Sequence, residues 1–499
     1  CCSRLLLTME DTMSSRHRFL PLCLTAILAG VAAAAAPAAK PVKKPPSPQM
    51  VIPVGPKKLT VVAGRPFESI PASGPSKLYM VMCAEETEPA TFAVRYAQAL
   101  PRVRVAAGTD LVGPGKIART NVEVSRIAGD YFFNARSAAS GAVYADTDIG
   151  PDPTPFWVNV TVPRRTPPGL YKGAISFYVQ NKVFDVVNIE VKVLPMRLIG
   201  SCKQYIPLTP YGPAGQDGCK LSGDDYLRFL KAFSKLGFRT VSVNATPGDL
   251  EKALQAHESA GEIGKIPVLT YALAAIVPTV QDVQVMEAAR RNAGCKPLLY
   301  AVLANPSTEA EIETACQQAQ VFRLAGVRSI AAVTDESALE RLGPLVDGVV
   351  YDLHAPYVQS LLDGRTVRTS SQVQWFSWNA RRTPLENRIN AGAAAWKSGL
   401  DGCMPVWMPS DGPWEREMNS LFAEALREGI DDTRYLTSYM KALRELKDLK
   451  RENDKDYIAA TEAYLAKFMS RPVDQFRAAD VDALRLKMAE FTMKLESML

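Results

Sequence analysis

The sequence predicts three regions in order: an antiparallel β-sandwich, a (β/α)8 barrel and a group of C-terminal helices. Three observations lead to this prediction. Short alternating strand patterns come first, strand-like runs alternating with amphipathic helices come next, and helical spacing alone continues to the end. A chain of 499 residues is also too long for one hydrophobic core, so several domains are expected.

The sandwich is predicted over residues 58–197. Apolar and polar residues alternate there, as in strands that bury one face, and proline and glycine separate the strands. Residues 166–169 (Thr-Pro-Pro-Gly) predict a turn, because proline presets φ and glycine takes the positive φ that follows. We expect this turn to join two strands as a hairpin. Examples of the strand patterns are 59–62, 91–94, 157–162, 173–179 and 186–193.

The barrel is predicted over residues 198–430, where strand-like runs and helical stretches alternate as in parallel βαβ units. Eight units in about 210 residues match the usual size of a (β/α)8 barrel. A doubly wound open sheet is the alternative, and the count and even spacing favour the barrel. The eight runs are 205–211, 240–244, 266–271, 298–305, 329–334, 348–354, 373–379 and 403–408.

The C-terminal region is predicted to be helical and highly charged. The stretch 415–429 is interpreted as the last barrel helix, and residues 431–499 as a helical appendage with helices at 433–453, 456–469 and 473–498. Residues 441–455 mix both charge signs, which indicates a solvated helix face.

The N-terminus predicts export. Residues 16–18 are basic, 19–36 are apolar and end in an alanine run, and 37–57 form a linker rich in proline and lysine. We interpret 1–36 as a signal peptide, with 1–12 as upstream translation, and expect a secreted, periplasmic or cell-surface protein without a membrane span after cleavage. A transmembrane anchor is the alternative.

Composition excludes several classes of function. The net charge of +6 is spread along the chain without a basic block, which argues against a nucleic-acid partner. Beyond the signal peptide only His257 and His354 remain, and the six cysteines form no C-x-x-C pair, so no metal or cofactor is expected. Cys202 and Cys219 are either a disulfide or free thiols, and both interpretations stay open.

Candidate site residues follow from the barrel, because such folds carry their sites at the C-terminal strand ends. Five of the six tryptophans lie between residues 375 and 414, and aromatic rings pack against the flat faces of sugars. Core packing is the alternative for these aromatics. The predicted substrate-binding residues, for a glycan or glycoconjugate, are Tyr211, Tyr271, Asn305, Asp352, His354, Trp375, Trp378 and Trp407.

Asp335 and Glu336 are the one adjacent acidic pair at a predicted strand end, which makes them candidate catalytic residues. Glycoside hydrolysis needs two groups that flank the anomeric carbon, one of which protonates the leaving oxygen. The alternative is a helix cap, because acidic residues in a first turn interact favourably with the helix dipole.

Several stretches resemble glycoside hydrolase family 123 and the related domain of unknown function 4091. Residues 424–432 (EALREGIDD), followed by Arg434, Tyr435 and Leu436, are similar to a signature near the C-terminus of that family. The other similar stretches, in the same order as in the family, are 85–92 (EETEPATF), 157–173 (WVNVTVPRRTPPGLYKG), 346–348, 387–388 and 402–407. The resemblance covers roughly residues 58–450.

The resemblance implies retaining, substrate-assisted hydrolysis of β-linked N-acetylhexosamine by an adjacent Asp-Glu pair after the fourth barrel strand. The matching residues here are Ala304 and Asn305, which precede Pro306. Asn305 can form hydrogen bonds but cannot act as a general acid. Three hypotheses remain: a glycosidase that uses Asp335 and Glu336, a non-catalytic glycan-binding barrel, and a structural or cell-surface protein.

Overall fold

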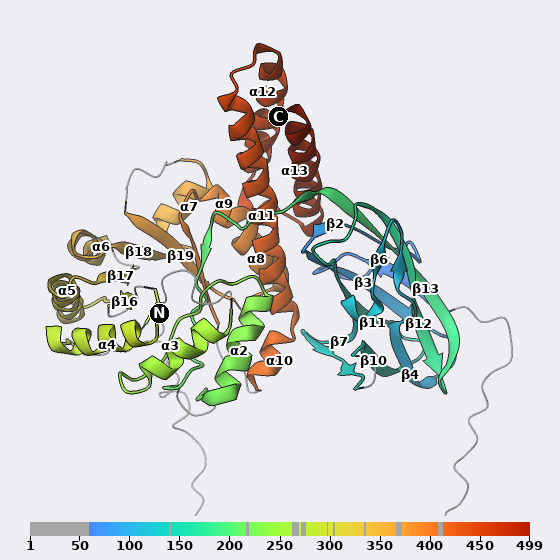
Figure 1. The fold of residues 1–499 in the computed structure, drawn as a ribbon, viewed down its shortest axis with the longest axis horizontal. Coiled ribbons are helices and arrows are strands. Elements are labelled where there is room, and N and C mark those ends of the chain that lie inside the picture. Colours follow the sequence, from blue (N-terminus) through green and yellow to red (C-terminus); the bar gives the residue numbers. More distant parts are fainter. Residues whose placement is uncertain are drawn as a thin grey trace, which may run out of the picture. The chain divides into compact units, whose positions relative to one another are not determined.

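The computed structural model describes residues 59–138, 141–215, 219–261, 269–270, 276–296, 298–302, 305–333, 336–365, 372–380, 382–407 and 413–499. The predicted signal peptide and linker lie outside the described residues. The described chain has the predicted layout of a β-sandwich, a parallel barrel-like sheet with helices, and C-terminal helices (Figure 1).

Two sheets form the sandwich. The first contains β1 (Thr60–Gly64), β3 (Thr87–Arg95), β11 (Thr154–Thr161), β7 (Val122–Ala128) and β8 (Tyr131–Phe133), in that order. The second contains β2 (Leu78–Ala84), β13 (Lys182–Arg197), β12 (Gly169–Val179), β4 (Leu100–Ala107), β10 (Val143–Ile149) and β9 (Ala135–Arg136), with β5 (Leu111–Val112) and β6 (Lys116–Ile117) beside β12. All these pairs are antiparallel except β2 with β13, which is parallel. Alternate side chains of both sheets meet in one core, where Phe92 of the first sheet packs edge-on against Phe177 of the second with ring centroids 6.3 Å apart.

The turn at residues 166–169 does not form the predicted hairpin. Strand β11 before it pairs with β3 and β7 in the first sheet, whereas β12 after it pairs with β13 and β4 in the second. The turn therefore passes from one sheet to the other. Gly169 does adopt the positive φ that the sequence requires (143°), and a Cβ there would collide with Pro114.

The predicted barrel is confirmed, and the open sheet is not. Its parallel sheet runs β14 (Gln204–Tyr205), β20 (Gly402–Val406), β19 (Val373–Asn379), β18 (Gly348–Asp352), β17 (Arg328–Val333), β16 (Leu299–Ala301) and β15 (Leu269–Thr270). The eighth segment, 240–244, completes the circle. Val243 donates its N–H to Leu269 O (2.7 Å) on one side, and Ser242 donates to Pro207 O (3.1 Å) on the other.

Helices cover the outside of the barrel. They are α2 (Gly223–Lys235), α3 (Leu250–Ser259), α4 (Val280–Asn292), α5 (Glu309–Leu324), α6 (Glu336–Leu342), α7 (Pro356–Leu362), α8 (Pro384–Ile389), α9 (Ala395–Lys397) and α10 (Trp414–Met418). A π-helical turn, Asn390–Ala394, joins α8 to α9. Thr279 and Thr308 begin α4 and α5 with capping boxes. Inward side chains such as Ile206, Leu299 and Val350 fill the barrel, while the alternate ones pack under the helices.

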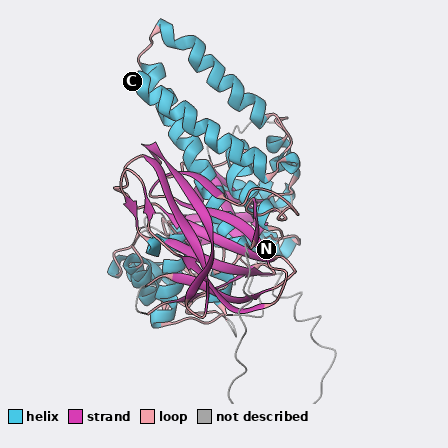
Figure 2. Ribbon diagram, turned by 90° about the vertical axis from the view of Figure 1, so that its right-hand side faces the viewer, coloured by secondary structure: helices cyan, strands magenta, loops and turns pink. Residues whose placement is uncertain are grey.

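The C-terminal region begins with one long helix rather than two. Helix α11 (Leu421–Asp448) runs through the predicted break at 430–432, and α12 (Lys455–Met469) and α13 (Ala478–Met498) follow it. Gly429 does not end the helix; a Cβ there would lie 2.6 Å from Ala391 Cβ, so the glycine permits close contact with the segment after α8. Helices α11 and α13 lie side by side (Figures 1 and 2).

A buried arginine connects α13 to the sandwich. The guanidinium of Arg485 is 3% exposed and contacts Asp432 (2.7 Å) and Glu428 (2.8 Å) on α11. Its other side contacts two carboxylates of the sandwich, Glu88 (2.6 Å) and, more distantly, Glu86 (3.8 Å). One cation therefore joins three segments that are far apart in the sequence.

The same network reaches the barrel through Arg388 on α8. Its Nε lies 3.0 Å from Asp432, and its Nη1 lies 2.8 Å from Asp482 on α13. The hydroxyl of Tyr435 on α11 donates to Glu86 Oε2 (2.7 Å), which also accepts the N–H of Cys83 (2.7 Å). Sandwich, barrel and C-terminal helices thus share one hydrogen-bonded charge network.

A second arginine of α11 adds a further link to the sandwich. Arg427 Nη2 lies 2.6 Å from Glu424 on its own helix, and its Nη1 donates to the carbonyl of Thr87 at the start of β3. Glu424 in turn accepts from Asn159 Nδ2 on β11 (3.0 Å). We call this set of residues the ion network. It consists of Arg388, Arg427 and Arg485 with their partners Glu86, Glu88, Glu424, Glu428, Asp432, Tyr435 and Asp482.

The first prediction concerns Arg485. Replacing it with alanine leaves several buried carboxylates without their cation, and we expect the free energy of unfolding to fall by about 3–5 kcal/mol. Chemical unfolding of wild type and Arg485→Ala measures this. Arg444→Ala, which removes an exposed arginine of α11, is the control and should change stability by less than about 0.5 kcal/mol. Equal stability of wild type and Arg485→Ala would contradict the prediction.

The second prediction concerns pH. Burial raises the pKa of Glu86 from its usual 4.5 to about 7, because the desolvation of the carboxylate and the nearby Asp431 outweigh the attraction of Arg485. Because folding raises the pKa of Glu86, the protonated side chain stabilises the folded state at pH values below the unfolded pKa of 4.5. This stabilisation is lost as the pH rises through the folded pKa of about 7.

Stability should therefore fall as the pH rises from the unfolded pKa of 4.5 to about 7 and should level off above that, and it should fall less in Glu86→Gln than in wild type. The neighbouring Glu85→Gln is the control, since Glu85 is exposed. Burial also raises the pKa of Glu88. Because Glu88 is unchanged in wild type and in both variants, its titration is common to all three pH profiles. Parallel pH profiles for wild type and Glu86→Gln would argue against a titration of Glu86 in this range.

Candidate functional site

The C-terminal ends of the barrel strands form the candidate site, which we call the mouth. Of the predicted residues, Tyr211, Asn305, Glu336, Asp352, His354, Trp375, Trp378 and Trp407 are described. Tyr271, Ala304 and Asp335 lie outside the described residues. The roles predicted for all of these residues remain predictions, and the structure gives the positions of the described ones.

Asp352 lies at the end of β18, on the inward side of the barrel. Val350, two residues earlier, belongs to the cluster that fills the barrel, and the alternation of a strand places Asp352 on the same side. It pairs in register with Ser377 on β19. Its Oδ1 accepts the N–H of the exposed His354 (2.8 Å). A half-buried carboxylate at this position can accept hydrogen bonds from sugar hydroxyls.

Asn305 follows β16, which is the fourth strand of the barrel after β14, the segment 240–244 and β15. Its N–H donates to Ala332 O on β17 (2.8 Å), and its φ is +48°. Asparagine is one of the few residues that tolerate this left-handed conformation. The end of the fourth strand therefore carries an amide, which can donate and accept hydrogen bonds but cannot supply an acidic proton.

Glu336 is exposed and begins α6, directly after the fifth strand, β17. An acidic residue in a first helical turn fits the predicted cap, since it faces the positive end of the helix dipole. The same position lies at the mouth end of the barrel. Both interpretations of Glu336 therefore stay open.

The predicted aromatic residues are buried. Trp375 fills the barrel and is 2% exposed; a Cβ at Gly348 would lie 2.6 Å from its ring, so the glycine makes room for it. Trp378 points to the opposite side, where its Nε1 donates to Asn387 Oδ1 (2.9 Å). Trp407 packs edge-on against Phe233.

Tyr211 is 1% exposed and packs against Phe229, with ring centroids 5.5 Å apart. Core packing accounts for the positions of all four aromatic side chains. On β19 the sequence VQWFSWN places apolar side chains on both faces of one strand, so periodicity alone could not assign its tryptophans.

The cysteines are free. All six of the described region are unpaired; Cys202 is exposed and Cys219 is buried, so the free-thiol alternative holds for this pair. In the part of the chain that the structure describes, no three His, Cys, Asp or Glu side chains are grouped to hold a metal ion. No helix there combines the length and apolar character needed to cross a membrane.

The sequence prediction missed the ion network. Its signal was present in residues 424, 427, 428 and 431, charged positions that share one side of a helix at the spacing i, i+3, i+4 and i+7. Arg485 carried no comparable signal, because its partners lie more than 50 residues away along the chain.

Comparison with solved structures supports the fold. A family 123 glycoside hydrolase from Clostridium perfringens, studied for glycolipid glycan hydrolysis, matches 89% of this chain and 100% of its own with a TM-score of 0.62 and 11% identity. A family 39 glycoside hydrolase from Bacteroides cellulosilyticus WH2 matches 72% of this chain and 81% of its own with a TM-score of 0.33 and 10% identity. No family model and no curated protein matches the sequence.

Proposed function

We propose that this chain is an exported glycoside-hydrolase-like protein that binds N-acetylhexosamine-containing glycans at the mouth of its barrel. We propose further that it does not hydrolyse them as family 123 enzymes do. The observation that carries the proposal is Asn305, which follows the fourth barrel strand, where the resemblance places the Asp-Glu pair. The fold shared with the Clostridium perfringens enzyme supports the choice of ligand class.

The chemistry of the mouth fits binding better than proton transfer. Asn379 ends β19 on the same side as Trp375, so it also lies at the mouth. Asn305, Asp352 and Asn379 offer amide and carboxylate groups, which recognise the hydroxyl and acetamide groups of an amino sugar. Hydrolysis also requires an acid that protonates the leaving oxygen, and an amide cannot do so. The loss of a general acid typically costs about 10²–10⁴-fold in rate.

Hydrolysis through Asp335 and Glu336 is the second candidate function. Glu336 favours it, because its exposed carboxyl group lies at the start of α6, at the mouth end of the fifth strand. An acid displaced by one strand could still reach a glycosidic oxygen if the sugar were bound further around the barrel.

Glycan binding is tested by calorimetry with N-acetylgalactosamine oligosaccharides. We expect measurable affinity in wild type and a loss of about 10-fold or more in Asp352→Ala and in Asn379→Ala, since each variant removes hydrogen bonds worth about 1.5 kcal/mol or more. Asp448→Asn, at the exposed end of α11, is the control and should bind as wild type does. Absence of binding in wild type would refute the proposal and leave the structural or cell-surface function.

Turnover is tested with aryl β-N-acetylhexosaminides. We expect wild-type turnover to be at least about 10²-fold below that of a competent glycosidase, because the general acid is missing from the fourth strand. Glu336→Gln should not lower what remains. A rapid wild-type reaction that Glu336→Gln abolishes would establish the second candidate function instead.

A further inference from the structure

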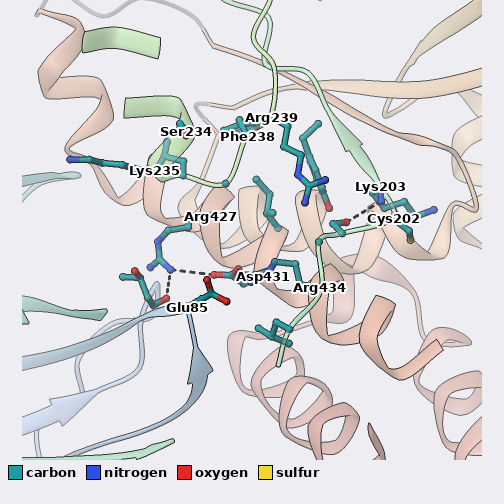
Figure 3. A pocket seen from close by; sticks show the side chains of 18 of the residues that line it. Glu85, Cys202, Lys203, Ser234, Lys235, Phe238, Arg239, Arg427, Asp431 and Arg434 are labelled. Atoms are coloured by element: carbon teal, nitrogen blue, oxygen red, sulfur yellow. Dashed lines mark hydrogen bonds and ion pairs between the residues drawn. The ribbon is translucent and has the colours of Figure 1, made fainter. Parts of the chain in front are cut away.

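A cavity of about 540 Å3 lies at the end of the barrel opposite to the mouth (Figure 3). The segment 197–205 leads into β14 and forms one wall, and the end of α2 forms another. Helix α11 and the sandwich residues Glu85 and Thr87 complete the cavity. Because residues 200–203 and Arg239 precede the first two barrel segments, and Gln204 and Tyr205 form the short strand β14, the cavity lies at the N-terminal ends of the strands. It is therefore separate from the candidate site.

Positive charge predominates in the lining of this cavity. Six lining side chains are cationic and two are anionic. Arg427 is also paired with Glu424 and Glu428, which lie behind the lining, so the excess is about two positive charges. The cationic residues are Arg197, Lys203, Lys235, Arg239, Arg427 and Arg434. Such an excess in a concave site raises the local concentration of anions.

Both carboxylates of the lining are already paired. Asp431 lies 2.6 Å from Arg434 and 3.4 Å from Arg427, and it is buried. Glu85 lies 3.2 Å from Arg197 and 3.7 Å from Arg164, an arginine of the sandwich that does not line the cavity. The two carboxylates of the lining therefore pair with only three of its cations, Arg197, Arg427 and Arg434.

Arg239 and Lys235 have no ion-pair partner among the residues that the structure describes. The guanidinium of Arg239 lies against the backbone of Gly200, in space that a side chain at position 200 would fill. Ser201 and Gln204 add polar groups to the wall, and Leu198 and Phe238 add apolar surface. A ligand here can therefore have an anionic group and a polar organic body.

One feature of the cavity opposes an anion. The carbonyl end of α2 contributes about half a negative charge. The last carbonyls of α2 are already hydrogen-bonded to the N–H groups of Leu236, Gly237 and Phe238. Half a charge is smaller than the remaining excess of about two positive charges, so the cavity remains favourable for anions.

We propose that this cavity binds a small organic anion, namely a phosphate or sulfate ester of a sugar-sized molecule. Arginine recognises tetrahedral oxyanions through paired hydrogen bonds, which favours Arg239 as the principal contact. The volume lies within the range of about 300–1,000 Å3 that small-molecule sites occupy, so it exceeds the needs of a bare ion. The N-terminal face of a barrel does not carry catalysis, and the site binds without turnover.

The test is calorimetry of the full chain at low ionic strength with glucose 6-phosphate, glucose 6-sulfate and glucose. We expect an ester to bind, with the preferred ester identifying the source of the anion, and glucose not to bind. Arg239→Ala and Lys235→Ala should each weaken binding about 10-fold or more, and Arg239→Lys should recover part of the loss. Arg323→Ala, which removes an exposed cation of α5, is the matched control and should have no effect.

Two results would overturn the proposal. One is the absence of ester binding at millimolar concentration in the wild type. The other is a loss in Arg323→Ala equal to that in Arg239→Ala, which would indicate attraction to net charge alone. Because the cavity lies opposite to the mouth, Asn379→Ala should leave ester binding unchanged, so failure of this proposal is distinguishable from failure of the proposed glycan binding.

Discussion

The arrangement of this protein depends on the burial of Arg485 of α13 among carboxylates of two other segments, the sandwich and α11. A buried guanidinium costs several kcal/mol in lost hydration, and only well-placed partners offset that cost. Glu88 comes from the sandwich, Asp432 comes from α11, and Asp432 is shared with Arg388 of the barrel helix α8. No single domain can satisfy Arg485 alone. The charges therefore favour the assembled arrangement over any partly docked one, and Leu59–Leu499 forms one compact unit.

Three of the sequence stretches that resemble family 123 supply residues of this ion network. The stretch 424–432 supplies Glu428 and Asp432, the stretch 85–92 supplies Glu86 and Glu88, and Arg388 belongs to the pair 387–388. They are three of the six stretches that resemble family 123, and in space these three meet at a domain junction rather than at the mouth. Likeness at such a junction favours a shared fold, and it leaves the chemistry of the mouth free to differ.

Much of the fold could be predicted from the sequence, because strand and helix periodicities reflect burial on one face or two. The eight barrel segments and five of the sandwich strands (β1, β3, β11, β12 and β13) were found in this way. The break expected near residue 430 was wrong because Gly429 serves helix contact, and the hairpin expected at 166–169 was wrong because partner choice between sheets is not local. For the same reason the burial of Trp378 against Asn387, and the partners of Arg485, required three-dimensional information.

The two ends of the barrel are governed by different constraints. At the mouth, loops after the strands carry the polar groups and can change without disturbing the core. At the opposite end, Arg427 and Asp431 belong both to helix α11 and to the wall of the cavity, so they cannot change without affecting domain docking. Arg239 and Lys235 are exposed and make no ion pair in the described part of the chain. The recognition of an anion that we propose for this cavity therefore depends on Arg239 and Lys235, which do not belong to the ion network.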